Sequence, residues 1–161
     1  MNIRPANEED LPEIFAIFSQ VVKGGDTFPY PPETSREEFK NIWFGKGMRA
    51  YVLVDDSAII GSYVIKALWP GRASHVAHGS YMVDPKARGK GAGQALGQHS
   101  LEEAKRLGFS SMQFNLVVST NEAAVRLWQK LGFVIVGTVP QAFRHEEHGM
   151  VDAFVMHRRI D

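Results

Sequence analysis

The chain has 161 residues, of which 44% are hydrophobic and 22% charged, so a chain disordered throughout is excluded. Eighteen basic and eighteen acidic residues give a formal charge of zero, which argues against a general binder of nucleic acid or of a membrane surface. The absence of cysteine excludes disulfide scaffolds, thiolate metal sites and cysteine nucleophiles. The length predicts a single domain over residues 1–161. With neither a signal-peptide pattern nor a run of about 20 apolar residues, a soluble, cytoplasmic protein is expected.

The first part of the chain predicts a short strand and two helices. The strand is expected at Asn2–Arg4, and Asn7 can cap a helix whose apolar residues recur at three- and four-residue steps. Ser35 and Glu38 form a capping box for the second helix. Between the helices, three prolines exclude regular structure from Asp26–Pro32.

The rest of the chain predicts strands that give way to an alternation of helix and strand. The expected elements are strands at Arg49–Asp55, Ile59–Leu68 and Ser74–Val83, a helix at Gly91–Leu107, a strand at Ser111–Val118, a helix at Asn121–Leu131, and strands near Phe133–Gly137 and Met150–His157. The resulting order is β-α-α-β-β-β-α-β-α-β-β. A meander that passes into a βαβ unit predicts the α/β (α+β) class, with a mixed sheet of about seven strands and about four helices packed on its faces.

The most informative segment is a glycine-rich turn between a predicted strand and a predicted helix. Gly89, Gly91 and Gly93 let the backbone turn tightly and approach a ligand closely. The unpaired N–H groups at the start of the helix favour an anion, typically a pyrophosphate, and Arg88 and Lys90 would add charge-assisted contacts. The spacing fits neither a P-loop nor a Rossmann fingerprint. The alternative is a flexible turn with solvated basic residues.

Two motifs resemble the GNAT superfamily of N-acetyltransferases. The first is Arg88-x-x-Gly91-x-Gly93, which follows a strand ending in Val83-Asp84-Pro85. The second is Asn121-x-x-Ala124-x-x-Leu127-Trp128-x-x-Leu131-Gly132-Phe133. The predicted order of elements is also similar over nearly the whole chain. The resemblance implies a mostly antiparallel GNAT-like sheet and acetyl transfer from acetyl-CoA to an amine by direct attack in a ternary complex.

The resemblance also implies which residues hold acetyl-CoA. The expected contacts are the main-chain groups of Met82 and Val83, with Asn121 and Trp128 beside the pantetheine arm. Asn121 is equally well explained as the N-cap of its helix, and both roles can hold at once. The pyrophosphate would lie on the turn made of Arg88, Gly89, Lys90, Gly91, Ala92 and Gly93. Trp128 departs from the tyrosine that many family members carry, and an indole N–H cannot protonate the leaving thiolate.

Three further segments are similar to fungal N-acetyltransferases that act on proline analogues such as azetidine-2-carboxylate. They are Pro70-Gly71-Arg72-x-Ser74-His75, Phe114-Asn115-Leu116-Val117 and Ile135-Val136-Gly137-Thr138-Val139-Pro140. This second resemblance implies that the acceptor is an amino acid or an amino-acid analogue.

The candidates for chemistry at the acceptor amine are His78 and Asn115. His78 lies on the strand that leads into the glycine turn and titrates near pH ~6.5, so it can act as the base, contact the substrate or be structural. Asn115 interrupts an apolar strand. Its amide is expected to form a hydrogen bond either with a neighbouring backbone group or with the acceptor substrate or the acetyl carbonyl. Phe28 and Tyr30, in the loop Gly24–Pro32, are expected to close the site as a lid, and the alternative is that the loop is a plain connector between the two helices.

No metal site is expected. His75 and His78 would lie on opposite faces of a regular strand, and the run His145–His148 is typical of a solvated turn. The expected function is N-acetylation of a small-molecule amine, without nucleic acid or membrane as partner, by a chain that similar proteins suggest forms a homodimer. The alternatives are a protein or peptide N-acetyltransferase and a catalytically silent acyl-CoA sensor.

Overall fold

The computed structural model describes residues 1–160, which form a seven-stranded sheet in the order β1-β2-β3-β4-β5-β7-β6. The strands are β1 (Asn2–Pro5), β2 (Arg49–Asp55), β3 (Ala58–Ala67), β4 (Val76–Val83), β5 (Ser111–Val118), β6 (Val134–His145) and β7 (Gly149–Arg159). The helices are α1 (Leu11–Lys23), α2 (Arg36–Phe44), α3 (Ala92–Arg106) and α4 (Glu122–Lys130), with short 3-10 turns η1 (Glu8–Asp10), η2 (Gly71–Ala73) and η3 (Pro85–Ala87). The predicted order of strands and helices is confirmed.

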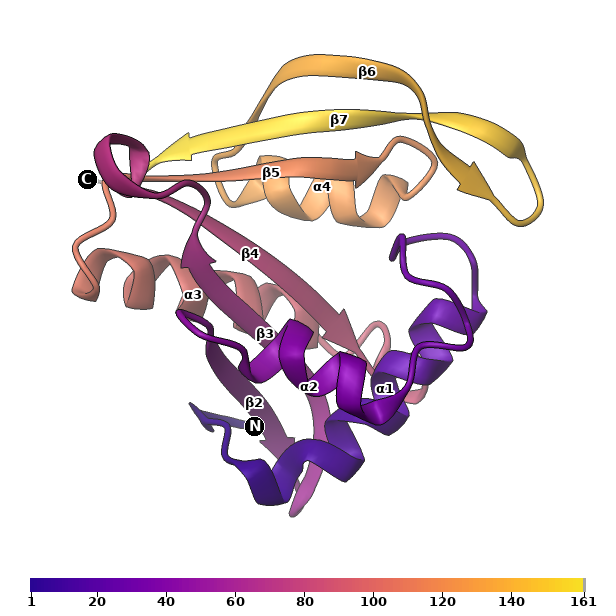
Figure 1. Ribbon diagram of the computed structural model, residues 1–161, viewed down its shortest axis with the longest axis vertical. Helices are drawn as coiled ribbons and strands as arrows, with labels where there is room; N and C mark the ends of the chain where they lie inside the picture. The colour runs from indigo at the N-terminus through magenta and orange to yellow at the C-terminus, as the bar shows by residue number, and fades with distance from the viewer. Residues whose placement is uncertain (161) are drawn as a thin grey trace.

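The helices cover the two faces of the sheet as two layers (Figure 1). One hydrophobic core lies between the sheet and α1 and α2, around Phe18, Phe39 and Trp43. The other lies between the sheet and α3 and α4, around Leu96 and Trp128. None of the helices in residues 1–160 has both the length and the apolar character needed to cross a membrane.

The sheet opens at the boundary between β4 and β5. This pair is parallel and holds together only at Val76 with Ser111 and Ala77 with Met112, whereas the other neighbouring pairs described in residues 1–160 are antiparallel. Beyond Ala77 the two strands diverge, as Figure 1 shows. A register shift between Phe114 and Val117 places a bulge in β5, and a bulge bends its strand.

Element boundaries differ from the predicted ones where turn chemistry intervenes. Asn7 does act as a cap, but its side chain caps the 3-10 turn η1, and α1 begins only at Leu11. Strands β6 and β7 are longer than predicted, and β6, the edge strand of the sheet, continues through Pro140. An edge position tolerates Pro140, which would interrupt the ladder of a central strand.

Three tyrosines of neighbouring strands fix α3 against the sheet. Tyr51, Tyr63 and Tyr81 are cross-strand partners, and their rings stack with centroids 4.8 and 5.6 Å apart. Each hydroxyl bonds a side chain of α3, at 2.5, 2.8 and 2.8 Å respectively: Glu103, His99 and Ser100. These three hydrogen bonds fix α3, the helix that follows the glycine turn, against the sheet.

Helix α2 is fixed to the opposite face by a buried polar chain. The Trp43 indole N–H donates to the Ser62 hydroxyl at 2.8 Å, and this hydroxyl donates to the Tyr51 carbonyl at 2.7 Å. Trp43 and Ser62 are both fully buried. No water can therefore replace either bond if Ser62 is lost.

We expect Ser62→Ala to lower the free energy of unfolding by about 1–3 kcal/mol, because it leaves a buried donor and a buried acceptor unpaired. Chemical denaturation monitored by tryptophan fluorescence measures the change. Ser74→Ala, at an exposed position, is the matched control and should change stability by less than about 0.5 kcal/mol. Equal effects of the two substitutions would contradict a structural role for this chain of bonds.

Candidate functional site

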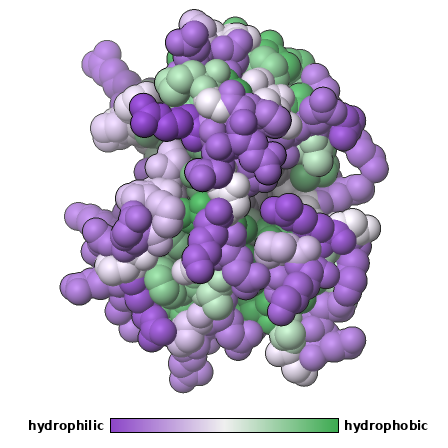
Figure 2. Space-filling model, turned by 90° about the vertical axis from the view of Figure 1, so that its right-hand side faces the viewer, coloured by the Kyte–Doolittle hydropathy of each residue, from purple (hydrophilic) through white to green (hydrophobic). Residues whose placement is uncertain are grey.

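A cavity of about 330 Å³ lies where β4 and β5 diverge. Its walls come from the α1–α2 loop, β4, the glycine turn, β5 and α4. The lining residues are Val21, Thr27, Phe28, Pro29, Tyr30, His78, Gly79, Ser80, Tyr81, Met82, Val83, Arg88, Gly93, Phe114, Leu116, Val117, Val118, Asn121, Ala124, Leu127 and Trp128. Figure 2 views the side of the molecule that carries the α1–α2 loop, where hydrophobic surface shows between hydrophilic groups.

The cavity passes through the sheet. Successive side chains of β4 alternate between its faces, so His78, Ser80 and Met82 share the face of α1 and α2 with Val64, a cross-strand partner of Ser80. Tyr81 and Val83 lie on the face of α3 and α4. Two reactants can therefore reach the same gap from opposite faces of the sheet.

The edge of β4 along the cavity offers unpaired main-chain groups. Asp84 N–H donates to the Ile60 carbonyl and Leu68 N–H to the Val76 carbonyl, each at 2.8 Å. Hydrogen-bonded pairs alternate in antiparallel ladders, so the main-chain groups that point toward β3 are those of His78, Ser80 and Met82. The groups that face the gap are those of Gly79, Tyr81 and Val83.

This register separates the two predicted β4 contacts. Val83 directs its main chain to the gap, whereas Met82 directs its main chain to β3 and lines the cavity with its side chain. The main chain of Tyr81, which the sequence reasoning did not name, also faces the gap. The alternation of the strand could have revealed it, because Tyr81 and Val83 share parity.

The glycine turn has the backbone that an anion cradle needs. Gly89 and Gly91 have φ angles of +79° and +81°, a left-handed conformation that favours glycine. Gly91 is the N-cap residue of α3 and makes no side-chain cap bond, so the first N–H groups of the helix stay available. A Cβ atom at either glycine would meet nothing within 4 Å. Both glycines are therefore required for conformation and leave open space beside the turn.

The predicted turn residues divide between the cavity and its approach. Arg88 and Gly93 line the cavity. Gly89, Lys90 and Gly91 are exposed in the turn, and Ala92 is buried as the first residue of α3.

Asn121 and Trp128 both line the cavity. The Asn121 side chain accepts a bond from Ala124 N–H at 3.2 Å and so also caps α4. Trp128 is buried, with ring centroids 4.7 Å from those of Tyr81 and Phe114.

His78 lies at the apex of the gap, directly after the last paired residue of β4. Its Nδ1 is 3.0 Å from the Gln113 carbonyl oxygen. A carbonyl only accepts, so Nδ1 carries the proton and Nε2 of the neutral ring keeps its lone pair. Burial lowers the pKa of His78 from its ordinary value, the Gln113 bond opposes this effect, and the charge of Lys66 adds to it.

Two of the remaining candidates line the cavity and one does not. Phe28 and Tyr30 come from the α1–α2 loop and pack on Phe18, with centroid distances of 6.1 and 5.5 Å. Asn115 lies in the bulge of β5, is exposed, and accepts a bond from the Gln113 side chain at 2.8 Å. The structure therefore does not bring Asn115 to the cavity wall.

Two polar lining residues were missed by the sequence reasoning. Ser80 shares the face of His78 two residues along β4, and strand parity could have identified it. Thr27 belongs to the α1–α2 loop, and nothing in its sequence context separates it from its neighbours.

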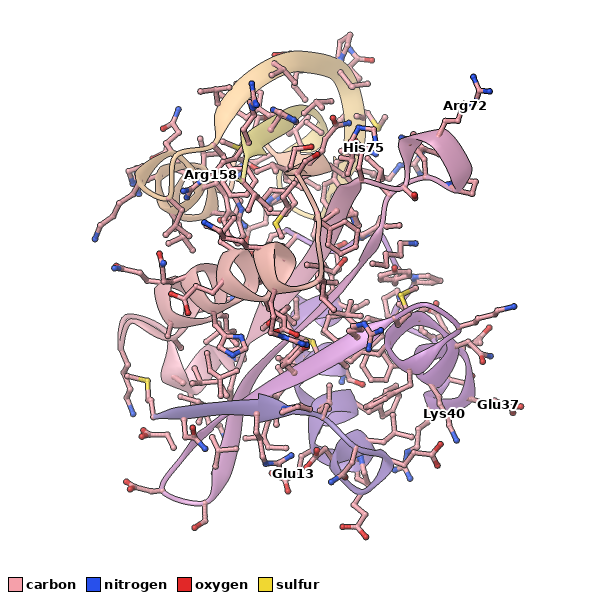
Figure 3. The ribbon with its side chains drawn as sticks, turned by 90° about the vertical axis from the view of Figure 1, so that its left-hand side faces the viewer. Glu13, Glu37, Lys40, Arg72, His75 and Arg158 are labelled. Carbon is pink, nitrogen blue, oxygen red and sulfur yellow. The ribbon has the colours of Figure 1, made fainter. Side chains whose placement is uncertain are left out.

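The histidines outside the cavity have other surroundings. Figure 3 shows His75 beside the η2 turn, from which Arg72 projects outward. His145 differs from the predicted solvated run, because it ends β6, is buried, and accepts bonds from Glu147 and His148 N–H at 3.1 and 3.3 Å. In residues 1–160 no group of three or more His, Asp or Glu side chains is arranged to hold a metal ion.

The residues around the cavity fit a thioester cofactor with a pyrophosphate. The open left-handed glycines and the uncapped start of α3 suit the pyrophosphate. The free main-chain edge at Tyr81 and Val83 suits the amides of a pantetheine arm, which would add to the sheet as a strand does.

Comparison with known proteins agrees with this geometry. A model described as the acetyltransferase (GNAT) family matches residues 11–133. The chain is 32% identical to the N-acetyltransferase aca1 of Schizosaccharomyces pombe, covering 92% of this chain and 80% of that protein. It is 32% identical to an L-methionine sulfoximine/L-methionine sulfone acetyltransferase of Pseudomonas aeruginosa, covering 87% and 84%.

The solved structure of a GCN5-related N-acetyltransferase from Kribbella flavida has the same fold. The two chains superpose with a TM-score of 0.94 at 44% identity, covering 98% of this chain and 96% of that one. Homologous structures hold acetyl-CoA.

We expect Gly91→Ala to raise the Kd for acetyl-CoA roughly tenfold or more, because a left-handed alanine costs about 1–2 kcal/mol and shifts the turn. Isothermal titration calorimetry measures the affinity. Gly47→Ala is the matched control, since Gly47 has a φ of +82° and equally open surroundings but lies outside the turn. Both variants should lose stability, and only Gly91→Ala should lose affinity. Unchanged affinity in Gly91→Ala would refute the pyrophosphate assignment.

Proposed function

Because the chain belongs to the GNAT acetyltransferase family, we propose that it acetylates the amine of a small molecule, an amino acid or an amino-acid analogue. The observation that carries the proposal is the cavity through the sheet. The glycine turn lies at its α3–α4 side, and His78 and the aromatic loop lie at its α1–α2 side. Acetyl-CoA and an acceptor can therefore meet at the gap from opposite faces.

The cofactor supplies an acetyl group as a thioester. The chain would hold it with the α3 N-terminus, Arg88 and Gly93 at the pyrophosphate, and with the Tyr81 and Val83 main chains along the arm. The same N–H groups are donors for the negative charge that develops on the acetyl oxygen during attack. Asn121 and Trp128 form the wall beside them.

His78 is the proposed base. Its pKa is lowered, so the ring is neutral at pH 7. The bond from Nδ1 to the Gln113 carbonyl orients the ring and leaves Nε2 to accept the amine proton. A neutral base in a partly buried site also favours the unprotonated amine, the form that attacks.

No tyrosine lining the cavity is suited to protonate the leaving thiolate. The Tyr81 hydroxyl is engaged by Ser100 at 2.8 Å, and burial raises the pKa of Tyr81 well above its usual value. Burial also raises the pKa of Tyr30. A thiol with a pKa near ~8.5 can leave as the thiolate and take its proton from solvent.

The shape of the acceptor side favours a small molecule. The Phe28–Tyr30 segment forms one wall of a cavity of only about 330 Å³. The relative from Pseudomonas aeruginosa, named for acetylation of L-methionine sulfoximine and sulfone, supports an amino-acid acceptor.

The proposal is tested by free-thiol release from acetyl-CoA in the presence of amino acids, proline analogues, polyamines and short peptides. We expect turnover with one or more amino acids or analogues. Turnover confined to peptides, or none with any acceptor, would refute the proposed substrate class.

We expect His78→Gln to lower kcat by about 10²–10⁴-fold and to remove the acidic limb of the pH–rate profile. In the wild type, the limb of kcat/KM that belongs to His78 should lie below about pH 6.5, because the neutral ring is active and the pKa of His78 lies below its ordinary value. His75→Gln, at an exposed position before β4, is the control and should leave both unchanged. A His78→Gln enzyme with the wild-type profile would exclude His78 as the base.

A further inference from the structure

We infer that Lys66 binds the carboxylate of the acceptor, so that the enzyme selects α-amino acids with uncharged, largely apolar side chains over amines that lack a carboxylate. The inference rests on the proposed function and names the group that recognises the substrate.

Lys66 lies directly opposite His78. The two residues are register partners in the β3–β4 ladder, so their Cβ atoms are about 4.5–5.5 Å apart on one face of the sheet. That face is the one that carries the α1–α2 loop, with Phe28 and Tyr30. An ammonium on a flexible four-carbon stem can therefore reach ligands held at the His78 ring.

The Lys66 ammonium has no partner within residues 1–160, where the structure gives it neither an ion pair nor a side-chain hydrogen bond. Apart from His78, its neighbour on the same face is apolar Val64, two positions earlier on β3. The Lys66 side chain is partly buried, and its ammonium is available to a bound anion. The charge of Lys66 also lowers the pKa of His78, so its position weakens the proposed base until an anion binds.

Lys66 lies beside the cavity and is not one of its lining residues, and the lining residues restrict the rest of the acceptor molecule. None of the residues lining the cavity is Asp or Glu, so a polyamine or an aminoglycoside would bring cationic groups without a counter-charge. The lining side chains on the α1–α2 side are mostly apolar, namely Val21, Phe28, Pro29, Tyr30 and Met82, and the polar ones, Thr27, His78 and Ser80, carry no acidic group.

An α-amino acid with an apolar side chain suits both the Lys66 ammonium opposite His78 and the mostly apolar lining of the cavity. Its amine and carboxylate are attached to one carbon, so an amine placed at Nε2 of His78 brings the carboxylate to the neighbourhood of the opposite residue on β3. The side chain is then left to pack against Phe28 and Tyr30. Pairing with a carboxylate would also neutralise the charge that lowers the pKa of His78.

The test compares amino acids with the amines that remain when their carboxylate is removed. Wild type and Lys66→Met are assayed with L-methionine and 3-(methylthio)propylamine, and with L-phenylalanine and phenethylamine. We expect Lys66→Met to raise KM for the amino acids about 10- to 100-fold, the effect of a lost charge-assisted bond, and to leave KM for the amines unchanged. Lys66→Arg should restore most of the affinity.

Lys40→Met is the matched control. Lys40 pairs with Glu8 at 3.1 Å on the surface, and Figure 3 shows it on the outer side of α2. Lys40→Met should leave KM unchanged for both the amino acids and the amines.

The outcomes separate this inference from the proposed function. The role of Lys66 alone is overturned if the wild-type enzyme acetylates amino acids but Lys66→Met leaves KM for them unchanged. It is also overturned if Lys66→Met raises KM equally for the amino acids and the amines. A wild-type enzyme that acetylates none of the four compounds, nor any other amino acid, overturns the proposed function and the inference with it. Melting temperatures of all variants show whether any loss comes from unfolding.

Discussion

The parallel pairing of β4 and β5 ends after two residues, and the candidate site depends on this early separation. A complete ladder would use the main-chain groups of Tyr81 and Val83 and leave no gap for ligands. Two features accompany the separation. The His78 ring takes the Gln113 carbonyl that a continuing β4 would otherwise approach, and the bulge after Phe114 bends β5. The hydrogen bond from the His78 ring thus replaces one of the main-chain bonds that are lost where β4 and β5 separate.

The gap between β4 and β5 can bind ligands only if the helices on either side of it keep their positions on the sheet. The stacked tyrosines fix α3 on one face, and the Trp43–Ser62–Tyr51 chain fixes α2 on the other. Tyr51 takes part in both systems, its hydroxyl bonding Glu103 and its carbonyl accepting from Ser62. One residue of β2 therefore links the helix that begins at the glycine turn to the helix that follows the aromatic loop.

Sequence reasoning recovered the features whose cause is local. The glycine turn, the Asn121 cap and the order of elements follow from backbone conformation, capping and hydrophobic period, which neighbouring residues determine. The placement of Asn115 does not follow from its neighbours in the sequence, because it depends on a bulge in the pairing of β5 with β7. The surroundings of His145 likewise include the distant α1–α2 loop, because Asp26 lines a pocket with His145 and the Gly25 carbonyl accepts from Glu146 N–H at 3.0 Å.

That last contact connects the acceptor side to the far end of the chain. Gly25 has a φ of +62°, and a Cβ atom there would lie 2.7 Å from the Glu146 Cβ, so the α1–α2 loop fits closely against the turn between β6 and β7. Between them a second cavity of about 260 Å³ is lined by Asp26, Asn121, Glu122 and His145, among others. Asn121 lines both cavities and also caps α4. The α1–α2 loop therefore borders both the acceptor wall and the pocket beside the start of α4, so one short segment lies next to both halves of the site.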